Sequence, residues 1–301
     1  MSISLMEHDM RLQCQYIDEF KAPDPLPHDE LDTAIFTGSG DSLAAAMLAE
    51  AHSGLAAKAA DPLDMAKNGF LLHGRRLFIV SISGRTISNI RVAAMTDTAT
   101  AITARPQSDL GRICQSVIPL RYPSAGGVTA GTISFLASAL HCISLVRAVE
   151  IPDPRQILDD ARRQAKEADL QGRVFVLGNL QTYPLALYTT AKLYEVLGYG
   201  ASCQRIEQFF HADLFSARGG DTVIVLESPI KNAKSPVEIA ARAGLHVLHP
   251  QPPQNDTVSQ FLFYTFFAQE LSLSLAKKQK LRDCYFVDAG PFLDASSAMI
   301  Y

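Results

Sequence analysis

The sequence lacks the patterns that mark membrane, secreted or nucleic-acid-binding proteins. No uninterrupted apolar stretch reaches the ~18 residues that a membrane-spanning helix needs, and the N-terminal MSISLMEHDMRLQ carries charges too early for a signal peptide. The net charge is -4, and no Lys/Arg cluster is longer than KKQK at 277–280, which is typical of a solvated helix end. We therefore expect a soluble, cytoplasmic protein with no nucleic acid and no membrane as partner.

Cysteine is also scarce, and its five residues have no close neighbour of their own kind. This spacing fits neither a zinc site nor a disulfide framework. We expect reduced thiols that are mostly buried as small apolar residues. The five are Cys14, Cys114, Cys142, Cys203 and Cys284.

Apolar residues make up 48% of the 301 residues, enough for two domains of ordinary size. Short apolar strands alternate with helical stretches, a pattern typical of a parallel sheet with helices on both faces. Prolines in EIPDPRQ at 150–156 interrupt this order, which then starts again. We predict a duplicated α/β fold with domains at 1–150 and 151–301, and a long helix at about 128–149 that closes the first half.

Two loops in the first half place hydroxyl groups directly after apolar strands, GSGDS at 38–42 and SISGRT at 81–86. The carboxyl ends of parallel strands meet at one edge of a sheet, so the two loops are expected to share a crevice. Three hydroxyls, a glycine and a helix start with exposed N–H groups suit a phosphate dianion. The alternative for the first loop is a tight turn with an N-cap from Asp41 or Ser42. It is not a dinucleotide fingerprint, because Leu43 stands where a third glycine is needed.

A third loop, SAGGVTAGT at 124–132, precedes the long helix of the first half. Its glycines allow close backbone approach and Thr129 or Thr132 could present a hydroxyl, but a flexible turn with a capping threonine is the alternative. The stretch VIVLESPIK of the second half corresponds to FIVSISGRT and lacks the hydroxyl cluster. We therefore expect phosphate binding in the first half alone.

In the second half, Tyr188, Lys192 and Glu195 are spaced to share one helix face. Periodicity alone favours a surface Lys–Glu pair, which stabilises a helix by only ~0.3–0.5 kcal/mol. His211 follows two phenylalanines in RIEQFFHADLF, and its alternative is a core histidine with a satisfied ring.

Together these motifs resemble the sugar isomerase (SIS) family, whose members include the isomerase half of glucosamine-6-phosphate synthase and two-domain phosphosugar isomerases and deaminases. The motif S-x-S-G-x-T after a strand carries the resemblance in the first half, and YPLALYTTAKLYEVLG carries it in the second. The resemblance covers nearly the whole chain. It implies two tandem SIS-type, flavodoxin-like domains, the first with an N-terminal helix.

The resemblance also implies roles for individual residues. The family's catalytic glutamate falls on Glu195 and its neighbouring lysine on Lys192, and the family spacing then places the catalytic histidine on His211. In relatives this histidine comes from the neighbouring subunit, which implies a homodimer with composite active sites. The phosphate would be held by Ser42, Ser81, Ser83 and Thr86, with weaker contributions from Gly40, Asp41, Arg85, Val128, Thr129 and Lys192.

The implied reaction is aldose–ketose isomerisation of a hexose 6-phosphate through an enediol. Glu195 would move the proton between C1 and C2, and His211 would open the ring, so no metal or organic cofactor is expected. Two departures from the family leave alternatives open: the chain has no lysine after Lys280, and the third loop has no arginine, although Arg121 lies just before it. The alternatives are an amino-sugar phosphate deaminase or deglycase and a non-catalytic sugar-phosphate sensor.

Overall fold

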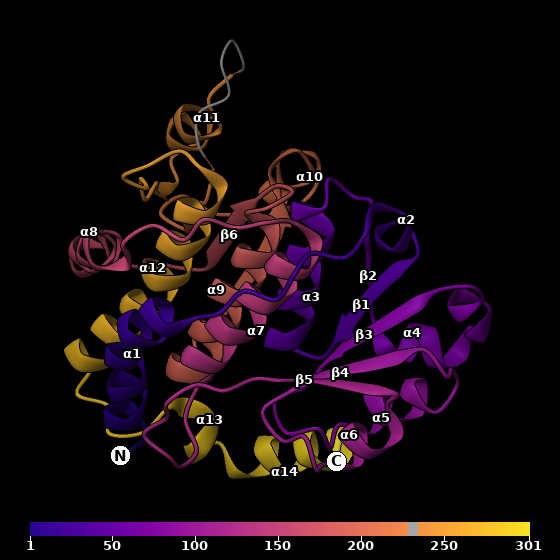
Figure 1. The fold of residues 1–301 in the computed structure, drawn as a ribbon. Coiled ribbons are helices and arrows are strands. Elements are labelled where there is room, and N and C mark those ends of the chain that lie inside the picture. Colours follow the sequence, from indigo (N-terminus) through magenta and orange to yellow (C-terminus); the bar gives the residue numbers. More distant parts are fainter. Residues whose placement is uncertain (228–233) are drawn as a thin grey trace. The chain divides into compact units, whose positions relative to one another are not determined.

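The computed structural model describes residues 1–227 and 234–301, which pack into two compact units. The first unit consists of Asp9–Ala125, Gly131–Val149 and Ala289–Tyr301. The second consists of Met1–His8, Gly126–Ala130 and Glu150–Asp288. Each contains one parallel sheet flanked by helices, which confirms the predicted α/β class (Figure 1).

The first unit is built on a five-stranded sheet of order β2-β1-β3-β4-β5. Its strands are β1 (Ala34–Gly38), β2 (Lys58–Ala60), β3 (Arg76–Val80), β4 (Ala99–Thr103) and β5 (Ser116–Pro119). Its helices are α2 (His28–Leu31), α3 (Asp41–His52), α4 (Pro62–Lys67), the 3-10 helix η1 (Gly69–Leu72), α5 (Ile87–Ala93), α6 (Asp109–Ile113), α7 (Ile133–Val146) and α14 (Gly290–Ile300). Helix α1 (Ser2–Glu19) contributes residues to both units.

Side-chain alternation along these strands explains the layers of the first unit. Ile35, Leu77 and Ile79 point to one face, where they pack against residues of α4, α5 and α6. Phe36 and Phe78 point to the opposite face, with stacked rings 4.8 Å apart. Helix α3 packs on the sheet, and α7 packs against α3 (Figure 1). Both faces are therefore buried, as the continuous apolar strands predict.

The second unit is built on a four-stranded sheet of order β7-β6-β8-β9. Its strands are β6 (Val174–Gly178), β7 (Ala201–Arg205), β8 (Thr222–Val225) and β9 (His246–Leu248). Its helices are α8 (Pro154–Glu167), α9 (Tyr183–Leu197), α10 (Ile206–His211), the 3-10 helix η2 (Asp213–Ser216), α11 (Pro236–Arg242), α12 (Thr257–Lys278) and α13 (Tyr285–Asp288). Phe175, Leu177 and Phe209 belong to the core between the sheet and α10.

Some elements differ from the prediction. The helix expected from about 128 begins only at Ile133, because Thr132 before it has φ of -121° and ψ of -82°, outside the α-helical region. Strands β2 and β7 were not predicted, since both are edge strands without an apolar run. All five cysteines are free thiols, and three of them are buried.

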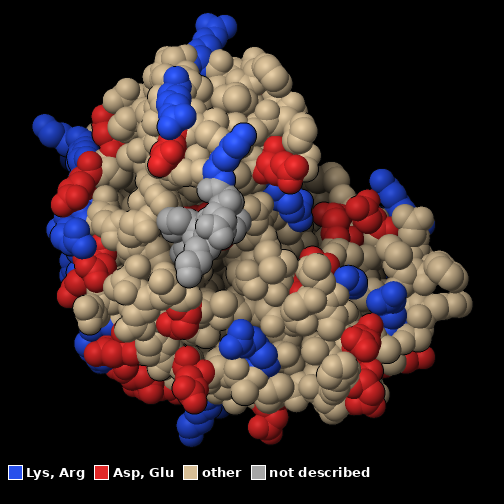
Figure 2. All heavy atoms as spheres, turned by 90° about the horizontal axis from the view of Figure 1, so that it is seen from above, with Lys and Arg blue, Asp and Glu red and all other residues tan. Residues whose placement is uncertain are grey.

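The charged side chains of the described residues do not form a large patch of one sign in the view of Figure 2. On the face shown in Figure 2, the described Lys and Arg side chains alternate with Asp and Glu over a mostly uncharged surface. Within the described ranges, no helix is both long enough and apolar enough to cross a bilayer.

A buried histidine in the first unit makes stability depend on pH. His52, near the end of α3, is 7% exposed, and both its ring nitrogens lack a hydrogen-bond partner among the described residues. Burial, and secondarily the guanidinium of Arg147, lower the pKa of His52 from 6.5 to about 4. The folded state therefore binds fewer protons than the unfolded state between these values, and stability falls as the pH drops from 6.5 towards 4.

We expect His52→Leu to remove this part of the acid sensitivity. The full effect of the shift is about 3 kcal/mol in the free energy of unfolding, complete below the folded-state pKa. Urea unfolding at several pH values between neutrality and mild acid measures it, with exposed His28→Gln as control. Parallel pH profiles for wild type and His52→Leu would contradict the assignment.

Candidate functional site

The order of connections in the first sheet reverses between β1 and β3. The chain leaves β1 for β2 on one side and then returns to β3 on the other. Gly38, at the end of β1, pairs in register with Val80, at the end of β3. The loops GSGDS and SISGRT therefore start side by side at the carboxyl edge of the sheet, where ligands of such folds collect.

The first loop turns sharply into α3. A Cβ atom on Gly38 would lie 2.7 Å from the Cβ of Ser42, so the turn admits only glycine there. Gly40, with φ of 60°, occupies the N-cap position, and no side chain caps the helix. The alternative that Asp41 or Ser42 serves as N-cap is therefore wrong.

The second loop holds its hydroxyls in place through backbone N–H groups. The N–H of Gly84 donates to Ser81 Oγ at 3.2 Å, and the N–H of Arg85 donates to Ser83 Oγ at 3.3 Å. Each serine oxygen thus accepts from the backbone, which leaves its own O–H to donate elsewhere. Thr86 takes the N-cap position of α5 but makes no side-chain cap, so its hydroxyl is not used for capping either.

The third loop approaches the first. A Cβ atom on Gly131 would lie 2.8 Å from Asp41 Oδ2, so the residues before α7 lie beside the start of α3. Thr132 is the N-cap residue of α7 but does not cap it, and its buried hydroxyl has no partner among the described residues. The alternative of a capping threonine is therefore wrong for Thr132.

Other helices of the same unit are capped in the ordinary way. Asp61 accepts from two N–H groups at the start of α4, and Ser108 accepts from Gly111 at the start of α6. Helices α3, α5 and α7, which begin near one another at the carboxyl edge, have no such cap. The N–H groups at the start of α5 and α7 and the nearby hydroxyls are suited to bind an anion, whereas at α3 the N–H groups of Ser42 and Leu43 donate to backbone carbonyls.

Asn89 was not predicted as a site residue. It lies on α5 just after the hydroxyl motif, is 1% exposed, and neither atom of its amide group has a partner among the described residues. A buried, unsatisfied amide costs ~1–3 kcal/mol, which singles out this position. Its polarity within the apolar stretch ISNIRVAAM was the available signal.

In the second unit, Lys192 and Glu195 form an ion pair on α9. Lys192 is fully buried, with its Nζ 5.0 Å from the ring centre of Tyr188, whose hydroxyl accepts from Gln269 Nε2 at 3.0 Å. The surface-pair alternative is therefore wrong for the lysine. The Glu195 side chain is 37% exposed. The buried Lys192 ammonium therefore pairs with a carboxylate that solutes can reach.

His211 ends α10 and is largely exposed. Its side chain is 72% exposed, and Nε2 lies 3.7 Å from Glu207 Oε1. The alternative of a core histidine is therefore wrong. Ser42, Ser81, Ser83 and Thr86 belong to the first unit, while Lys192, Glu195 and His211 belong to the second.

The weaker candidates are distributed as follows. Arg85 is exposed in the second loop. Val128, 68% exposed, and Thr129 belong to the second unit, where the Thr129 hydroxyl donates to the carbonyl of Ser2 at 3.0 Å. The Thr129 hydroxyl is therefore already used in a hydrogen bond to the backbone. Gly40 and Asp41 lie at the start of α3.

The second sheet has its own reversal point between β6 and β8, with polar groups that the sequence reasoning missed. Thr182 Oγ1 lies 3.2 Å from Glu227 Oε2, and His249 Nε2 lies 2.7 Å from the Glu227 carbonyl. Burial raises the pKa of the Glu227 carboxyl. The rest of the loop, including SPIK of the stretch compared with the hydroxyl motif, lies outside the described residues.

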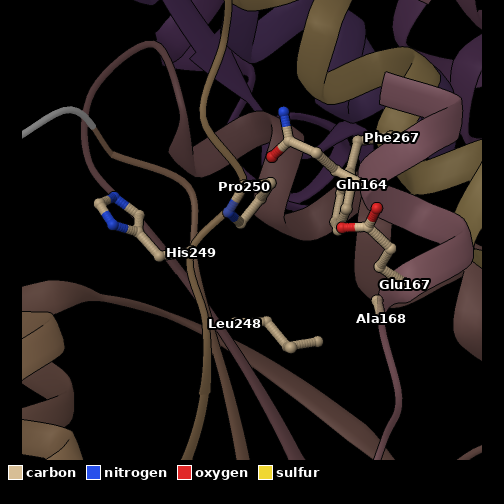
Figure 3. A pocket seen from close by; sticks show the side chains of 7 residues that line it. All are labelled: Gln164, Glu167, Ala168, Leu248, His249, Pro250 and Phe267. Carbon is tan, nitrogen blue, oxygen red and sulfur yellow. The ribbon is translucent and has the colours of Figure 1, made fainter. Parts of the chain in front are cut away.

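The pocket in Figure 3, about 200 Å³, lies between the end of α8 and the segment after β9. Its amide side chain, Gln164, exchanges two 2.8 Å hydrogen bonds with the backbone of Gln251. His249 lines the pocket, but its ring Nε2 bonds the backbone of Glu227. Gln164 and His249 of this pocket are thus hydrogen-bonded to the backbone. No group of three potential metal ligands occurs among the residues that the structure describes.

Solved structures of similar fold are known. The C-terminal domain of glucosamine-fructose-6-phosphate aminotransferase from Francisella tularensis matches with a TM-score of 0.68 and 15% identity, over 91% of this chain and 94% of that one. Its fold is that of the sugar isomerase family. Glucosamine-6-phosphate deaminase from Thermotoga maritima matches this fold with a TM-score of 0.69 and 16% identity, over 92% and 94% of the two chains.

Tagatose-6-phosphate ketose/aldose isomerase from Escherichia coli matches the sugar isomerase fold with a TM-score of 0.67 and 16% identity, over 91% and 92% of the chains. No family model matches the sequence, and no curated protein matches it. The predicted resemblance is confirmed as a resemblance of fold.

Proposed function

We propose that the protein is an enzyme that processes a sugar phosphate, and that its reaction is aldose–ketose isomerisation of a hexose 6-phosphate. The observation that carries the proposal is the hydroxyl-lined loop at the reversal point of the first sheet. There the oxygens of Ser81 and Ser83 accept from backbone N–H groups and keep their own O–H groups available. Solved structures that share the fold include an isomerase and a deaminase named for phosphorylated sugars.

In this proposal the phosphate is bound by the first unit. Ser42, Ser81, Ser83 and Thr86 donate hydrogen bonds to its oxygens, and the backbone N–H groups at the start of α5, the helix that follows the second loop, add further donors. Helix α5 has no side-chain cap that would compete for these N–H groups. Gly40, Asp41, Arg85, Val128 and Thr129 are weaker candidates around the ligand.

The proton transfer is assigned to the second unit. Glu195 takes the proton from C2 of the open-chain sugar and returns it to C1, or the reverse, through an enediol. The buried Lys192 ammonium holds one oxygen of the carboxylate, which fixes its orientation. His211 opens the sugar ring as a residue supplied by the partner subunit, and its 72% exposure in the single chain supports such a role.

The proposed assembly is thus a homodimer of chains with tandem domains at 1–150 and 151–301, acting in the cytoplasm. An amino-sugar phosphate deaminase is the second candidate, because the same base and ring-opening groups serve both reactions and one structural neighbour carries that name. A non-catalytic sugar-phosphate sensor is the third. The sensor is a candidate because the chain has no lysine after Lys280 and no arginine in the third loop.

Two assays separate these functions. Incubation with fructose 6-phosphate and detection of aldose phosphates tests isomerisation, and incubation with glucosamine 6-phosphate and detection of ammonia tests deamination. Aldose formation without ammonia supports the proposal, whereas ammonia without isomerisation supports the deaminase. Binding of both sugars without turnover identifies a sensor.

Removing single hydroxyls from the loop should weaken sugar-phosphate binding without unfolding the protein. A hydrogen bond to a charged group contributes ~1.5–3 kcal/mol, so Ser83→Ala and Thr86→Val should each raise the dissociation constant roughly 10- to 100-fold. Titration calorimetry measures this, with exposed Ser296→Ala on α14 as control. Equal affinities for Ser83→Ala, Thr86→Val and the control would place the phosphate elsewhere.

A further inference from the structure

Another pocket, in the first unit, is lined by a residue with a buried hydroxyl that has no hydrogen-bond partner among the described residues. It has a volume of about 430 Å³, within the range of ~300–1,000 Å³ usual for small-molecule sites. Its walls come from the end of α1, the segment after β5, and α7. The lining residues are Tyr16, Glu19, Phe20, Lys21, Pro119, Arg121, Pro123 and His141.

Aromatic rings form one wall of this pocket. Phe20 meets His141 edge to face at 5.1 Å and meets Tyr16 at 5.8 Å. Tyr16 is 4% exposed, and its hydroxyl has no hydrogen-bond partner among the described residues. Because an unsatisfied buried hydroxyl is costly, it points to a ligand group that would complete it.

His141 supplies a defined acceptor. Its Nδ1 lies 2.8 Å from the carbonyl oxygen of Ala137, so Nδ1 carries the proton and donates. Burial lowers the pKa of His141, which keeps the ring neutral near pH 7. The other ring nitrogen, Nε2, is then an acceptor for an N–H or O–H group.

Two cations lie at the rim. Lys21 and Arg121 are both exposed and line the pocket together with one carboxylate, Glu19. Glu19 Oε1 accepts from Gln15 Nε2 at 3.0 Å, so part of its hydrogen-bonding capacity is already used. The rim therefore has a net positive charge that suits a phosphate group.

We propose that this pocket binds a nucleoside monophosphate. The base would pack against the Tyr16, Phe20 and His141 wall, since flat aromatic ligands stack on such rings. The phosphate would pair with Arg121 and Lys21. A hexose phosphate fits less well, because the wall beneath the cations offers few partners for its several hydroxyls.

Calorimetric titration of the full chain with AMP and UMP tests the proposal, with adenosine and ribose 5-phosphate as probes that lack one half of the ligand. We expect AMP or UMP to bind at least about tenfold more tightly than either fragment, because both halves of the ligand contribute. If neither AMP nor UMP binds at a concentration of about 1 mM, the proposal is overturned.

Variants locate the ligand. Arg121→Gln should weaken nucleotide binding roughly tenfold or more, and Tyr16→Phe should weaken it about fivefold, because each removes one hydrogen-bonding group. Exposed Arg112→Gln, also in the first unit, is the matched control. Unchanged affinity in both pocket variants would overturn the assignment.

One further variant separates this pocket from the proposed sugar-phosphate site. Ser83→Ala should leave nucleotide affinity unchanged while it weakens hexose phosphate binding. Nucleotide binding that is lost in Ser83→Ala but kept in Arg121→Gln would mean that the nucleotide occupies the hydroxyl loop, and the pocket assignment would fail. Loss of hexose phosphate binding alone bears only on the proposed function.

Discussion

Replacing Glu195 by glutamine should lower kcat for the sugar phosphate by roughly 100- to 10,000-fold, the range usual for removal of a positioned general base. Glutamine keeps the shape of the side chain, and its amide oxygen can still accept from Lys192 Nζ. The hydrogen-bond network around Tyr188 and Gln269 lies deeper in the second unit and is left in place. We therefore expect a folded protein that binds its ligand but does not convert it.

Steady-state kinetics and calorimetry on the same preparation distinguish the outcomes. Exposed Glu150→Gln is the matched control and should keep wild-type kcat. A Glu195→Gln variant with undiminished turnover would remove the base assignment. If kcat stays constant and only KM rises, the carboxylate binds substrate and transfers no proton.

Replacing Gly84 by alanine should have the largest effect on stability. Gly84 has a φ of 62°, and an added Cβ would lie 1.9 Å from Ser108 Oγ, the oxygen that caps α6. The carbonyl of Gly84 also accepts from the N–H of Leu110 at 3.1 Å, which ties the two segments together. The strained backbone and the steric clash together should lower the free energy of unfolding by about 2–4 kcal/mol.

Urea unfolding of a matched pair tests this. Gly54 has a similar φ of 66° but nothing within 4 Å of an added Cβ, so Gly54→Ala shows the backbone term alone. A double variant that combines Gly84→Ala with Ser108→Gly should recover part of the lost free energy of unfolding, since Ser108→Gly removes the clashing side-chain atoms. Equal losses for Gly84→Ala and Gly54→Ala would mean that the close approach to Ser108 does not exist in solution.

Much of the candidate site could be predicted because its signals are local. A hydroxyl cluster directly after a strand predicts a loop at the sheet edge. The continuous apolar strands predict a sheet that is buried on both faces. The sequence could not show whether those hydroxyls cap their helices. Capping depends on whether the residue before the helix has the right backbone angles, and Gly40 takes the N-cap place from Asp41 and Ser42.

The environment of Lys192 could not be predicted for a different reason. Helix α9 is apolar on more than one face, so spacing does not tell which face meets α12 and which meets solvent. Burial of the ammonium follows from tertiary packing that brings Gln269 of α12 to Tyr188. Tyr16 and His141 likewise line one pocket although they are distant in sequence.

If the starts of α5 and α7, which have no side-chain cap, bind the anion of the proposed function, ligand supply would affect the lifetime of the protein. A bound anion would complete hydrogen bonds that the chain leaves to others, and any species that binds only the folded state shifts the folding equilibrium towards it. Cells rich in the ligand would then hold more of this chain in a protease-resistant form, so metabolite abundance would set its turnover as well as its occupancy.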